Sequence, residues 1–357
     1  MYPHLQVVRE KIHKNARRVL EACSRCSINV TAVTKGVCAD PEIVKILWEC
    51  GYRSFGDSRL ENVKRIRNQY PEAEITLIRP PMLSQISELS LYADNIFVSM
   101  KDSLPLLDKA RANRIGEKTL GIILLMEMGD IRDGIMEDEI DFFMDVLRDC
   151  KNLRLRGIAV NFGCFGGICP SPDKLEQMVN IKHKLEKEGY SELICSGGST
   201  SSLLLLERGE IPEGVNSLRI GEAILVGTDV VNSRRIDWLE RDTMILEAEI
   251  IEIRRKPSAP FGKTGLDAFG SRRSFEDRGE RLRGIAAIGK QDVNISGLFP
   301  LLKGVEILGV SSDHLILDLE SVKDTKELYY GNTLKFAINY SAMLPLYTSK
   351  FVKIDYI

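Results

Sequence analysis

A lysine near the amino terminus is the first candidate for chemistry. Lys35 ends a short apolar segment, residues 28–34, and a glycine follows it. A lysine at the end of a buried strand loses hydration, which lowers the pKa of its amine and makes it a nucleophile able to form a Schiff base. The alternative is a solvated lysine that ends a strand, and this segment alone does not distinguish the two.

The elements that must position this lysine alternate regularly along the first two thirds of the chain. Strand-like segments are predicted at residues 28–34, 52–55, 74–78, 95–98, 119–126, 153–160, 192–195 and 217–220. Apolar residues at three-to-four spacing between them predict amphipathic helices, and a further helix is predicted over residues 5–26. Asp40-Pro41 and Ser171-Pro172 are helix start signals, and Gly51 and Gly189 are stop signals. Eight strand-and-helix units favour a closed (β/α)8 TIM-type barrel over an open α/β sheet.

The character of the sequence changes after the eighth unit. Residues 244–253 alternate between apolar and polar, and four short strand-like segments follow at 284–288, 304–309, 315–319 and 333–338. Residues 257–279 are rich in Gly, Ser and Arg, which predicts a long loop or a hairpin arm. We therefore predict a barrel domain over residues 1–232 and a C-terminal all-β domain over residues 233–357.

Polar and charged residues follow the predicted barrel strands. Barrel enzymes place their chemistry at the carboxyl ends of the strands. The residues at those ends are Lys35, Asp57, Arg79, Arg132, Asn161, Ser196–Ser202, Arg219 and Gly221. A Gly/Ser-rich turn that leads into a helix offers N–H groups and hydroxyls to a phosphate, and barrels often bind phosphate after strands seven and eight. Taken singly, such a turn can be only a turn and such an arginine an ion-pair partner. Together they predict a phosphorylated cofactor facing a lysine, which matches pyridoxal 5'-phosphate.

These segments resemble the alanine racemase family, the barrel-type enzymes that use pyridoxal phosphate. The matching barrel segments are residues 32–35, 128–134, 157–162 and 218–221, and the resemblance continues at 287–292, 310–313 and 338–340. Within the family, the chain resembles the ornithine racemase branch at residues 33–35, 56–59, 164–167, 196–202 and 311–314. The resemblance therefore covers nearly the whole chain.

The resemblance implies roles for individual residues. Lys35 would hold the cofactor and act as one of two proton-transferring bases. Arg219 would bind the pyridine nitrogen and keep it unprotonated, because a guanidinium gives up no proton, and this favours return of a proton to Cα over transamination. Arg132 would lie beside the phenolic oxygen and the substrate carboxylate. The other cofactor contacts implied are Asn161, Ser199, Thr200, Ser201, Gly221 and Tyr340.

The chain departs from the family at the second base. Alanine racemases supply it as a tyrosine from the β domain of the partner subunit, and here that position is Lys290. Asn161 replaces a histidine of the family, and Ala39 lies where the family has a tyrosine. Lys290 is the predicted second base, with a structural or substrate-carboxylate contact as its alternative. Further candidates are Asp292, His314 and Cys164.

The expected substrate is ornithine or another basic amino acid. A buried cationic side chain needs a carboxylate, and Asp292, Asp313 and Glu222 lie in segments that could supply one. The alternatives are an alanine or broad-specificity racemase and a non-catalytic pyridoxal-phosphate homeostasis protein, although the latter ends near the eighth strand. A decarboxylase of this fold would need a cysteine after Cys195, and a metal-dependent aldolase would need a ligand beside His314. The resemblance implies a head-to-tail homodimer.

Composition narrows the class of protein. Lys and Arg number 49 and Asp and Glu 51 in 357 residues, so no basic excess indicates nucleic acid. No apolar stretch reaches the length of a membrane span, and the first residues lack the pattern of a signal peptide. Cys23 and Cys26 have metal-ligand spacing but no second pair, so no metal site is predicted. The eight cysteines are expected to be reduced thiols of a cytoplasmic protein.

Overall fold

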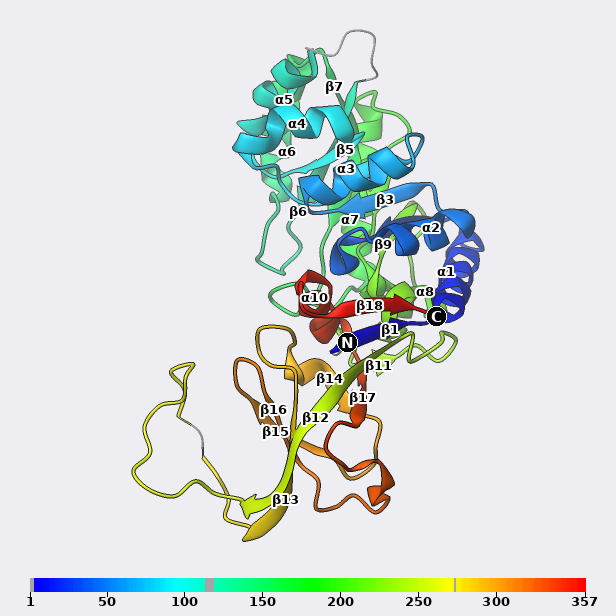
Figure 1. The fold of residues 1–357 in the computed structure, drawn as a ribbon. Helices are drawn as coiled ribbons and strands as arrows, with labels where there is room; N and C mark the ends of the chain where they lie inside the picture. Colours follow the sequence, from blue (N-terminus) through cyan, green and yellow to red (C-terminus); the bar gives the residue numbers. More distant parts are fainter. Residues whose placement is uncertain (1–2, 113–118, 273) are drawn as a thin grey trace. The chain divides into compact units, whose positions relative to one another are not determined.

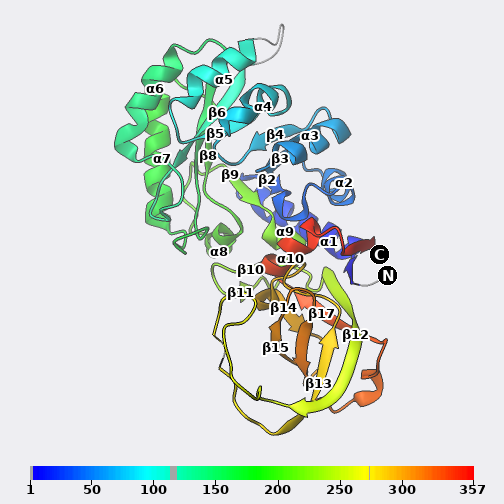
Figure 2. The same cartoon turned by 60° about the vertical axis from the view of Figure 1, so that its left-hand side comes forward.

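The computed structural model describes residues 3–112, 119–272 and 274–357. Its contacts divide the chain into two compact units, which Figure 1 and Figure 2 show from two sides. One unit contains residues 12–240. The other combines residues 1–11 with residues 241–357.

The first unit is built around a closed barrel of eight parallel strands. The strands are β2 (Asn29–Val33), β3 (Ser54–Asp57), β4 (Glu74–Leu77), β5 (Asn95–Val98), β6 (Leu120–Met126), β7 (Leu153–Val160), β8 (Ile194–Ser196) and β9 (Ser217–Ile220). Pairing of β2 with β9, in register from Asn29↔Ser217 to Ala32↔Ile220, closes the barrel. The predicted (β/α)8 fold is confirmed.

Helices surround this barrel (Figures 1 and 2). They are α1 (Arg9–Ser24), α2 (Pro41–Glu49), α3 (Leu60–Gln69), α4 (Ile86–Tyr92), α5 (Ser103–Ala112), α6 (Ile140–Arg148), α7 (Pro172–Lys187), α8 (Leu203–Arg208) and α9 (Glu222–Val226). The predicted caps are present: the Asp40 carboxylate accepts hydrogen bonds from the first N–H groups of α2, and the Ser171 hydroxyl caps α7. A two-stranded sheet of β10 (Thr228–Asp229) and β11 (Arg234–Arg235) follows α9.

The second unit is a mostly antiparallel sheet to which the helix α10 is added. Its strands run in the order β14-β17-β12-β13-β16-β15, and β1 pairs with both β12 and β18. The elements are β1 (His4–Val7), β12 (Met244–Pro257), β13 (Glu280–Ala286), β14 (Leu298–Pro300), β15 (Glu306–Val310), β16 (Leu315–Asp318), β17 (Thr333–Ile338), α10 (Tyr340–Thr348) and β18 (Lys353–Tyr356). The predicted C-terminal β domain is confirmed, and α10 is an addition to the all-β prediction.

The structure of the amino-terminal residues differs from the prediction. Residues 5–8 were predicted to begin the first helix and residues 1–232 to form the barrel domain. Instead β1 pairs antiparallel with β12, His4 opposite Glu247, and parallel with β18, His4 opposite Lys353. The β unit therefore takes residues 1–11, and its second segment begins at 241 rather than 233. A four-residue strand directly before a helix has no periodicity of its own, and its partners lie more than two hundred residues away.

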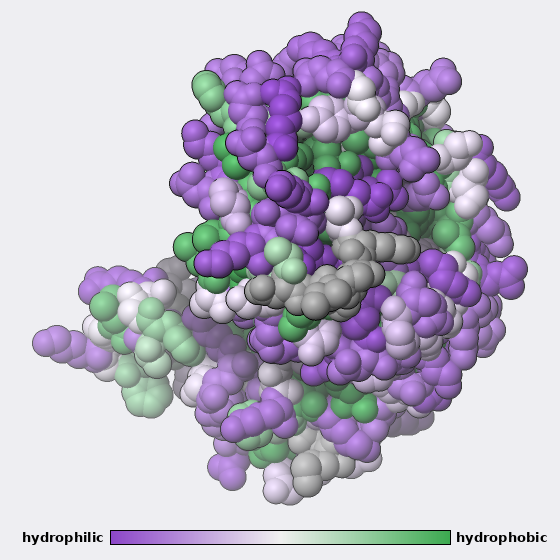
Figure 3. Space-filling model, turned by 90° about the horizontal axis from the view of Figure 1, so that it is seen from above, coloured by the Kyte–Doolittle hydropathy of each residue, from purple (hydrophilic) through white to green (hydrophobic). Residues whose placement is uncertain are grey.

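Hydrophilic side chains cover most of the face in Figure 3, with apolar side chains in small separate patches. None of the helices in the described part of the chain is both long enough and apolar enough to cross a membrane.

Candidate active site

Lys35 follows the carboxyl end of β2, as the first residue of the short 3-10 turn η1 (Lys35–Val37). Thr34, directly before it, is fully buried, and its hydroxyl donates a 2.7 Å hydrogen bond to Asp57 Oδ2 at the end of β3. This bond joins the carboxyl ends of the adjacent strands β2 and β3. Among the described residues, no hydrogen bond or ion pair reaches the Lys35 amine. The backbone of η1 therefore fixes the position of Lys35, and the side-chain nitrogen stays available for a reaction.

The surroundings of Lys35 favour its neutral form. Burial is the main cause and lowers the pKa of the amine. Electrostatic interactions with Cys164 and Asp57 oppose this lowering of the pKa, and the positive charges of Arg132 and Arg219 add to it. A lysine with a lowered pKa has more neutral, nucleophilic amine at neutral pH than an ordinary surface lysine. Four residues that the sequence analysis singled out thus lie within electrostatic range of Lys35.

Asp57 is bonded to the barrel wall through both of its carboxylate oxygens. Its side chain is fully buried, and burial raises the pKa of the carboxyl while hydrogen bonds oppose that rise. Oδ1 accepts hydrogen bonds from Asn62 Nδ2 and from the backbone N–H of Arg59, both at 3.0 Å. With Thr34 on the other oxygen, the carboxylate is fully engaged with the barrel wall. It orients the end of β2.

Arg219 extends from β9 into the barrel interior and is only 5% exposed. Nη1 donates to Ser196 Oγ at 2.6 Å, and Nη2 donates to Val160 O at 2.6 Å and Asn161 Oδ1 at 3.0 Å. The guanidinium carbon lies 5.2 Å from the centroid of the Phe97 ring. Burial lowers the pKa of this guanidinium to about 10. No carboxylate of the described residues lies within ion-pair distance of it, so a buried cation faces the site with neutral partners only.

The Gly/Ser-rich turn after β8 forms a polar cradle. The Ser201 hydroxyl is buried and has no hydrogen-bond partner among the described residues. Thr200 Oγ1 accepts a hydrogen bond from Ala223 N at 3.2 Å, which leaves its own proton for another acceptor. Gly221 lies at the start of α9, where an added Cβ would lie 2.8 Å from Val33 O. Buried hydroxyls without acceptors fit a ligand with phosphate oxygens.

Asn161 adds a second unsatisfied donor. Its side-chain oxygen accepts from Arg219, and its buried Nδ2 has no partner in the described part of the chain. Buried polar atoms are nearly always hydrogen-bonded in the functional state of a protein. Asn161 and Ser201 therefore both fit a polar ligand between β7 and β9. The predicted cofactor residues of the barrel unit are consistent with pyridoxal phosphate.

Arg132 lies on a strained loop after β6. The Glu127 carboxylate accepts hydrogen bonds from the backbone N–H groups of Gly129 at 2.5 Å and Ile131 at 3.0 Å. Ile131 has a φ of +52°, in the left-handed region that a β-branched side chain rarely adopts. Arg132 Nε donates to Asp133 Oδ1 at 2.6 Å. The loop thus presents Arg132 in a conformation that Glu127 maintains.

Asp130 joins this loop to the one after β7, a link that sequence reasoning missed. Its side chain is 2% exposed, and Oδ2 accepts hydrogen bonds from Cys164 N at 3.1 Å and Phe165 N at 3.0 Å. Its backbone oxygen accepts from Gly166 N at 3.0 Å. Nothing in the local sequence marks this aspartate, because its bonding partners follow a different strand.

Two further predicted residues are engaged by neighbouring parts of the barrel unit. Glu222, on α9, accepts hydrogen bonds from the Thr228 hydroxyl at 2.6 Å and Val230 N at 3.0 Å, and burial raises its pKa to about 7. Arg79 Nε donates to Ser58 O. In the described residues, no group of three His, Cys, Asp or Glu side chains is arranged to hold a metal ion.

The remaining predicted residues belong to the β unit, which is described by itself. The Lys290 ammonium lies 3.8 Å from the centroid of the Phe269 ring. Asp292 Oδ1 accepts a 2.6 Å hydrogen bond from Ser349 Oγ, and Asp313 Oδ1 accepts from Gln291 at 2.8 Å. Tyr340 is the first residue of α10. Their roles toward substrate and cofactor stay predictions.

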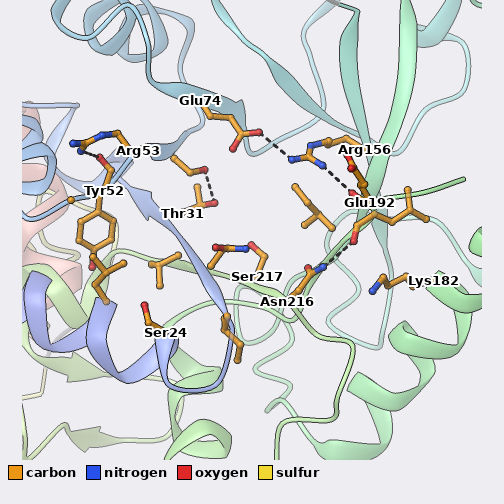
Figure 4. Close-up of a pocket in the computed structure, with 18 of the residues that line it drawn as sticks. Ser24, Thr31, Tyr52, Arg53, Glu74, Arg156, Lys182, Glu192, Asn216 and Ser217 are labelled. Carbon is orange, nitrogen blue, oxygen red and sulfur yellow. Dashed lines mark hydrogen bonds and ion pairs between the residues drawn. The ribbon is translucent and has the colours of Figure 1, made fainter.

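A cavity of about 640 Å3 opens at the opposite end of the barrel from Lys35 (Figure 4). Glu74 and Ser217, the first residues of β4 and β9, line it, and Arg156 Nη2 lies 3.8 Å from Glu74 Oε1. Because parallel strands place their carboxyl ends at the other face, this cavity is separate from the site around Lys35.

Comparisons with known proteins show the family to which the chain belongs, the alanine racemase family. The family model "Alanine racemase, N-terminal domain" matches residues 7–229. A lysine racemase of Thermotoga maritima is 42% identical over 354 residues, which are 99% of this chain and 98% of that protein. An ornithine racemase of Acetoanaerobium sticklandii is 35% identical over 356 residues, 99% of each chain.

The fold is also that of a solved structure. Alanine racemase from Bartonella henselae, with covalently bound pyridoxal phosphate, superimposes with a TM-score of 0.73 over 100% of both chains at 14% identity. At that identity the likeness shows the fold alone.

Proposed function

Because the chain belongs to the alanine racemase family and is a racemase, we propose that it interconverts the L and D forms of a basic amino acid with pyridoxal phosphate as cofactor. The observation that carries this proposal is the pair of basic side chains at the barrel mouth. Lys35 has a lowered pKa and an unengaged amine, and Arg219 is buried without a carboxylate. A nucleophilic amine facing a donor that cannot lose its proton suits this cofactor.

The barrel residues fit the parts of the cofactor. Lys35 Nζ would bind it covalently, and Arg219 would donate a hydrogen bond to its ring nitrogen. Ser199, Thr200, Ser201 and the Gly221 amide would hold the phosphate, with Tyr340 and Asn161 as further contacts. The unsatisfied hydroxyl of Ser201 and the unsatisfied Nδ2 of Asn161 support this assignment. When bound, pyridoxal phosphate withdraws electrons from the substrate Cα and so weakens its C–H bond.

Lys35, Arg132 and Arg219 would have separate roles toward the substrate and the cofactor. The neutral Lys35 amine would accept or return the α-proton on one face of the substrate Cα, which its lowered pKa favours. Arg132, exposed on its loop, would bind the substrate carboxylate. Arg219, whose pKa of about 10 keeps it protonated at neutral pH, would donate a hydrogen bond to the ring nitrogen without giving up its proton, which would favour return of a proton to Cα.

Specificity for a cationic side chain requires an acidic contact. Burial raises the pKa of Glu222 to about 7, which makes it a weaker anion at neutral pH than an ordinary carboxylate. We therefore propose Asp292 and Asp313 of the β unit as the contacts. We propose that they act in the site of a partner subunit within a homodimer. The Thermotoga and Acetoanaerobium relatives, a lysine and an ornithine racemase, support this substrate class. The eight free thiols favour a reducing compartment such as the cytoplasm.

A chiral assay tests the proposal. Purified protein supplied with pyridoxal phosphate is incubated separately with L-lysine, L-ornithine, L-arginine, L-alanine and L-norleucine, and the D enantiomers are quantified. We expect conversion of lysine or ornithine at least about tenfold faster than norleucine, which lacks only the distal amine of lysine. Equal turnover of norleucine or alanine would contradict the specificity. Borohydride reduction should fix the cofactor to the protein, and Lys35→Ala should abolish this labelling.

A further inference from the structure

The inside of the barrel has an apolar side and a side with small hydroxyl residues. The apolar side is a buried cluster of Phe97, Ile123, Leu125 and Ala159, with Ile78 and Ile194 packed against it. On the adjacent strands β9, β2 and β3, the cavity at the amino end of the barrel is lined by Ser217, Thr31 and Ser54. Bulky branched side chains usually fill the interior of such a barrel. The small hydroxyl residues leave this end unfilled, and the cavity of about 640 Å3 in Figure 4 results.

We propose that this cavity is a second binding site, which takes a small zwitterion of the free α-amino acid type. It lies at the opposite end of the barrel from Lys35, so it is separate from the site of the proposed racemase reaction and does not depend on that function. Its volume falls within the roughly 300–1,000 Å3 of small-molecule sites, which leaves room for a long side chain on the ligand.

The floor of the cavity offers hydroxyl groups to a ligand. Ser217 is 7% exposed, and its hydroxyl has no partner among the described residues. Thr31 Oγ1 and Ser54 Oγ lie 3.0 Å apart and share one hydrogen bond, so one of the two keeps its proton for another acceptor. Buried polar groups are nearly always hydrogen-bonded in a functional protein. The floor therefore has two O–H donors available to a ligand.

Arg156 and Glu74 face each other across the cavity without a direct hydrogen bond (Figure 4). Arg156 Nη2 lies 3.8 Å from Glu74 Oε1, which is too far for a hydrogen bond. The one hydrogen bond of the Arg156 guanidinium in the described chain runs from Nη1 to Glu192 O, at 2.9 Å. Asn95 Nδ2 donates to Glu74 Oε1 at 3.0 Å, and no described donor reaches Oε2. A cation and an anion thus both keep bonding capacity toward the same space.

This arrangement favours a ligand that carries both charges. A ligand carboxylate can accept from Arg156 Nη2 and from the floor hydroxyls, while a ligand ammonium donates to Glu74 Oε2. A ligand with a single charge would bind one of the two side chains and leave the other without its ion-pair partner. Because Glu74 and Arg156 are 40% and 26% exposed, their present ion pair contributes little, and its replacement by ligand contacts costs little.

The other charges of the cavity agree with a zwitterion. The charged side chains that line it are Arg53, Arg156 and Lys182 together with Glu72, Glu74, Glu186 and Glu192. Lys182 Nζ lies 3.5 Å from both Glu186 Oε1 and Gly214 O, at the outer limit of hydrogen bonding. Neither sign dominates, which disfavours a phosphate or another purely anionic ligand, and equally a pure cation.

The cavity is closed toward the cofactor residues. An inner chamber of about 20 Å3 is lined by Thr31, Ser54 and Ser217 on one side and by Ser196 and Arg219 on the other. This volume holds about one water molecule. An amino acid in the cavity therefore stops at the hydroxyl floor and does not reach Arg219.

Titration calorimetry of the borohydride-reduced holoenzyme tests the inference. Reduction fixes the cofactor to Lys35, so an added amino acid cannot react there. Glycine and L-lysine are the zwitterionic probes, while acetate and methylammonium each carry one of the two charges. The same titrations are repeated with variants of the cavity.

Three variants change the cavity and one serves as a control. Glu74→Gln removes the charge and keeps an oxygen that Asn95 can bond. Arg156→Gln removes the cation, and Ser217→Val replaces the free hydroxyl. Arg148→Gln removes an arginine from an exposed ion pair elsewhere and is the matched control. Thermal unfolding verifies that each variant is folded.

We expect glycine and L-lysine to bind the wild type at millimolar concentrations or below, and acetate and methylammonium at least about tenfold more weakly. Glu74→Gln and Arg156→Gln should each weaken binding of the zwitterions by at least about tenfold, because one charge-assisted hydrogen bond is lost. Ser217→Val should weaken it severalfold, and Arg148→Gln should bind like the wild type.

Absence of saturable binding overturns the inference, and so does acetate binding as tightly as glycine. Zwitterion binding that Glu74→Gln and Arg156→Gln leave intact also overturns it, and its loss in Arg132→Ala would then place the ligand in the site around Lys35. A wild type that takes up no cofactor would instead refute the proposed function. Titration of the cofactor-free protein would in that case still test the cavity.

Discussion

Arg219 Nη2 donates a 3.0 Å hydrogen bond to Asn161 Oδ1, which links the ends of β9 and β7 inside the barrel. The bond fixes the orientation of the asparagine, so its Nδ2 becomes the donor that lacks an acceptor. The buried guanidinium of Arg219 thereby orients the side chain of Asn161 as a second ligand-binding group. Arg219 can do this while it also bonds Ser196, because its guanidinium has two separate terminal nitrogens.

Replacing Arg219 by lysine tests this geometry. A single ammonium cannot span Ser196, Val160 and Asn161 in the way that the planar guanidinium does. We expect Arg219→Lys to lower the free energy of unfolding by about 1–3 kcal/mol, because buried acceptors lose their donor. Racemisation should fall by at least about tenfold, and urea unfolding together with the chiral assay measures both effects. Unchanged stability and activity would show that the hydrogen-bond fork is dispensable.

Ser201 and Ser202 are adjacent buried serines that should behave differently. The Ser201 hydroxyl has no partner in the described chain, whereas Ser202 Oγ donates to Gly197 O at 2.7 Å. Ser201→Ala should therefore leave the stability of the cofactor-free protein unchanged or slightly raised, yet weaken pyridoxal phosphate binding about tenfold through one lost charge-assisted hydrogen bond.

Ser202→Ala provides the contrast. It should destabilise the cofactor-free protein by about 1–3 kcal/mol, because Gly197 O loses its buried donor. Thermal unfolding without cofactor and fluorescence titration with pyridoxal phosphate separate the two effects. Equal cofactor affinity in Ser201→Ala and the wild type would remove Ser201 from the phosphate site.

Asp130 should control the loop that carries Cys164. Asp130→Ala removes the acceptor of Cys164 N and Phe165 N, whereas Asp130→Asn keeps one oxygen in that position. We expect amide hydrogen exchange in residues 162–169 to rise in the alanine variant, with racemisation reduced at least about tenfold, and to change less in the asparagine variant. If both variants exchange like the wild type, the two loops are not joined by this carboxylate.

The raised pKa of Glu222 should make the stability of the protein depend on pH. Burial raises its pKa from 4.5 to about 7, so its contribution to stability is fully present below pH 4.5 and is lost as the pH rises through 7. Glu222→Gln does not titrate, and its amide oxygen can accept from both Thr228 and Val230. Relative to the wild type, this variant should gain up to about 3 kcal/mol of unfolding free energy between pH 4 and pH 8. Urea unfolding at several pH values measures this difference. If the difference in unfolding free energy between the two proteins is the same at pH 4 and at pH 8, the raised pKa of Glu222 is refuted.

The sequence by itself determined the architecture and most of the barrel site. Alternating strand and helix periods specify the (β/α)8 fold because amphipathic helices must cover a buried parallel sheet. Since all barrel strands present their carboxyl ends at one face, Lys35, Arg132, Asn161 and Arg219 could be assigned to one site from their places after the strands.

Only the tertiary structure decided which buried polar groups have a hydrogen-bond partner and which do not. The pairing of β1 with β12, the Asp130 link between two loops and the unpartnered Ser201 hydroxyl all join residues from different parts of the chain. Local patterns record the period of a segment but not its distant hydrogen-bond partners. Burial, which lowers the pKa of Lys35 and raises that of Glu222, likewise arises only when the whole barrel has closed around them.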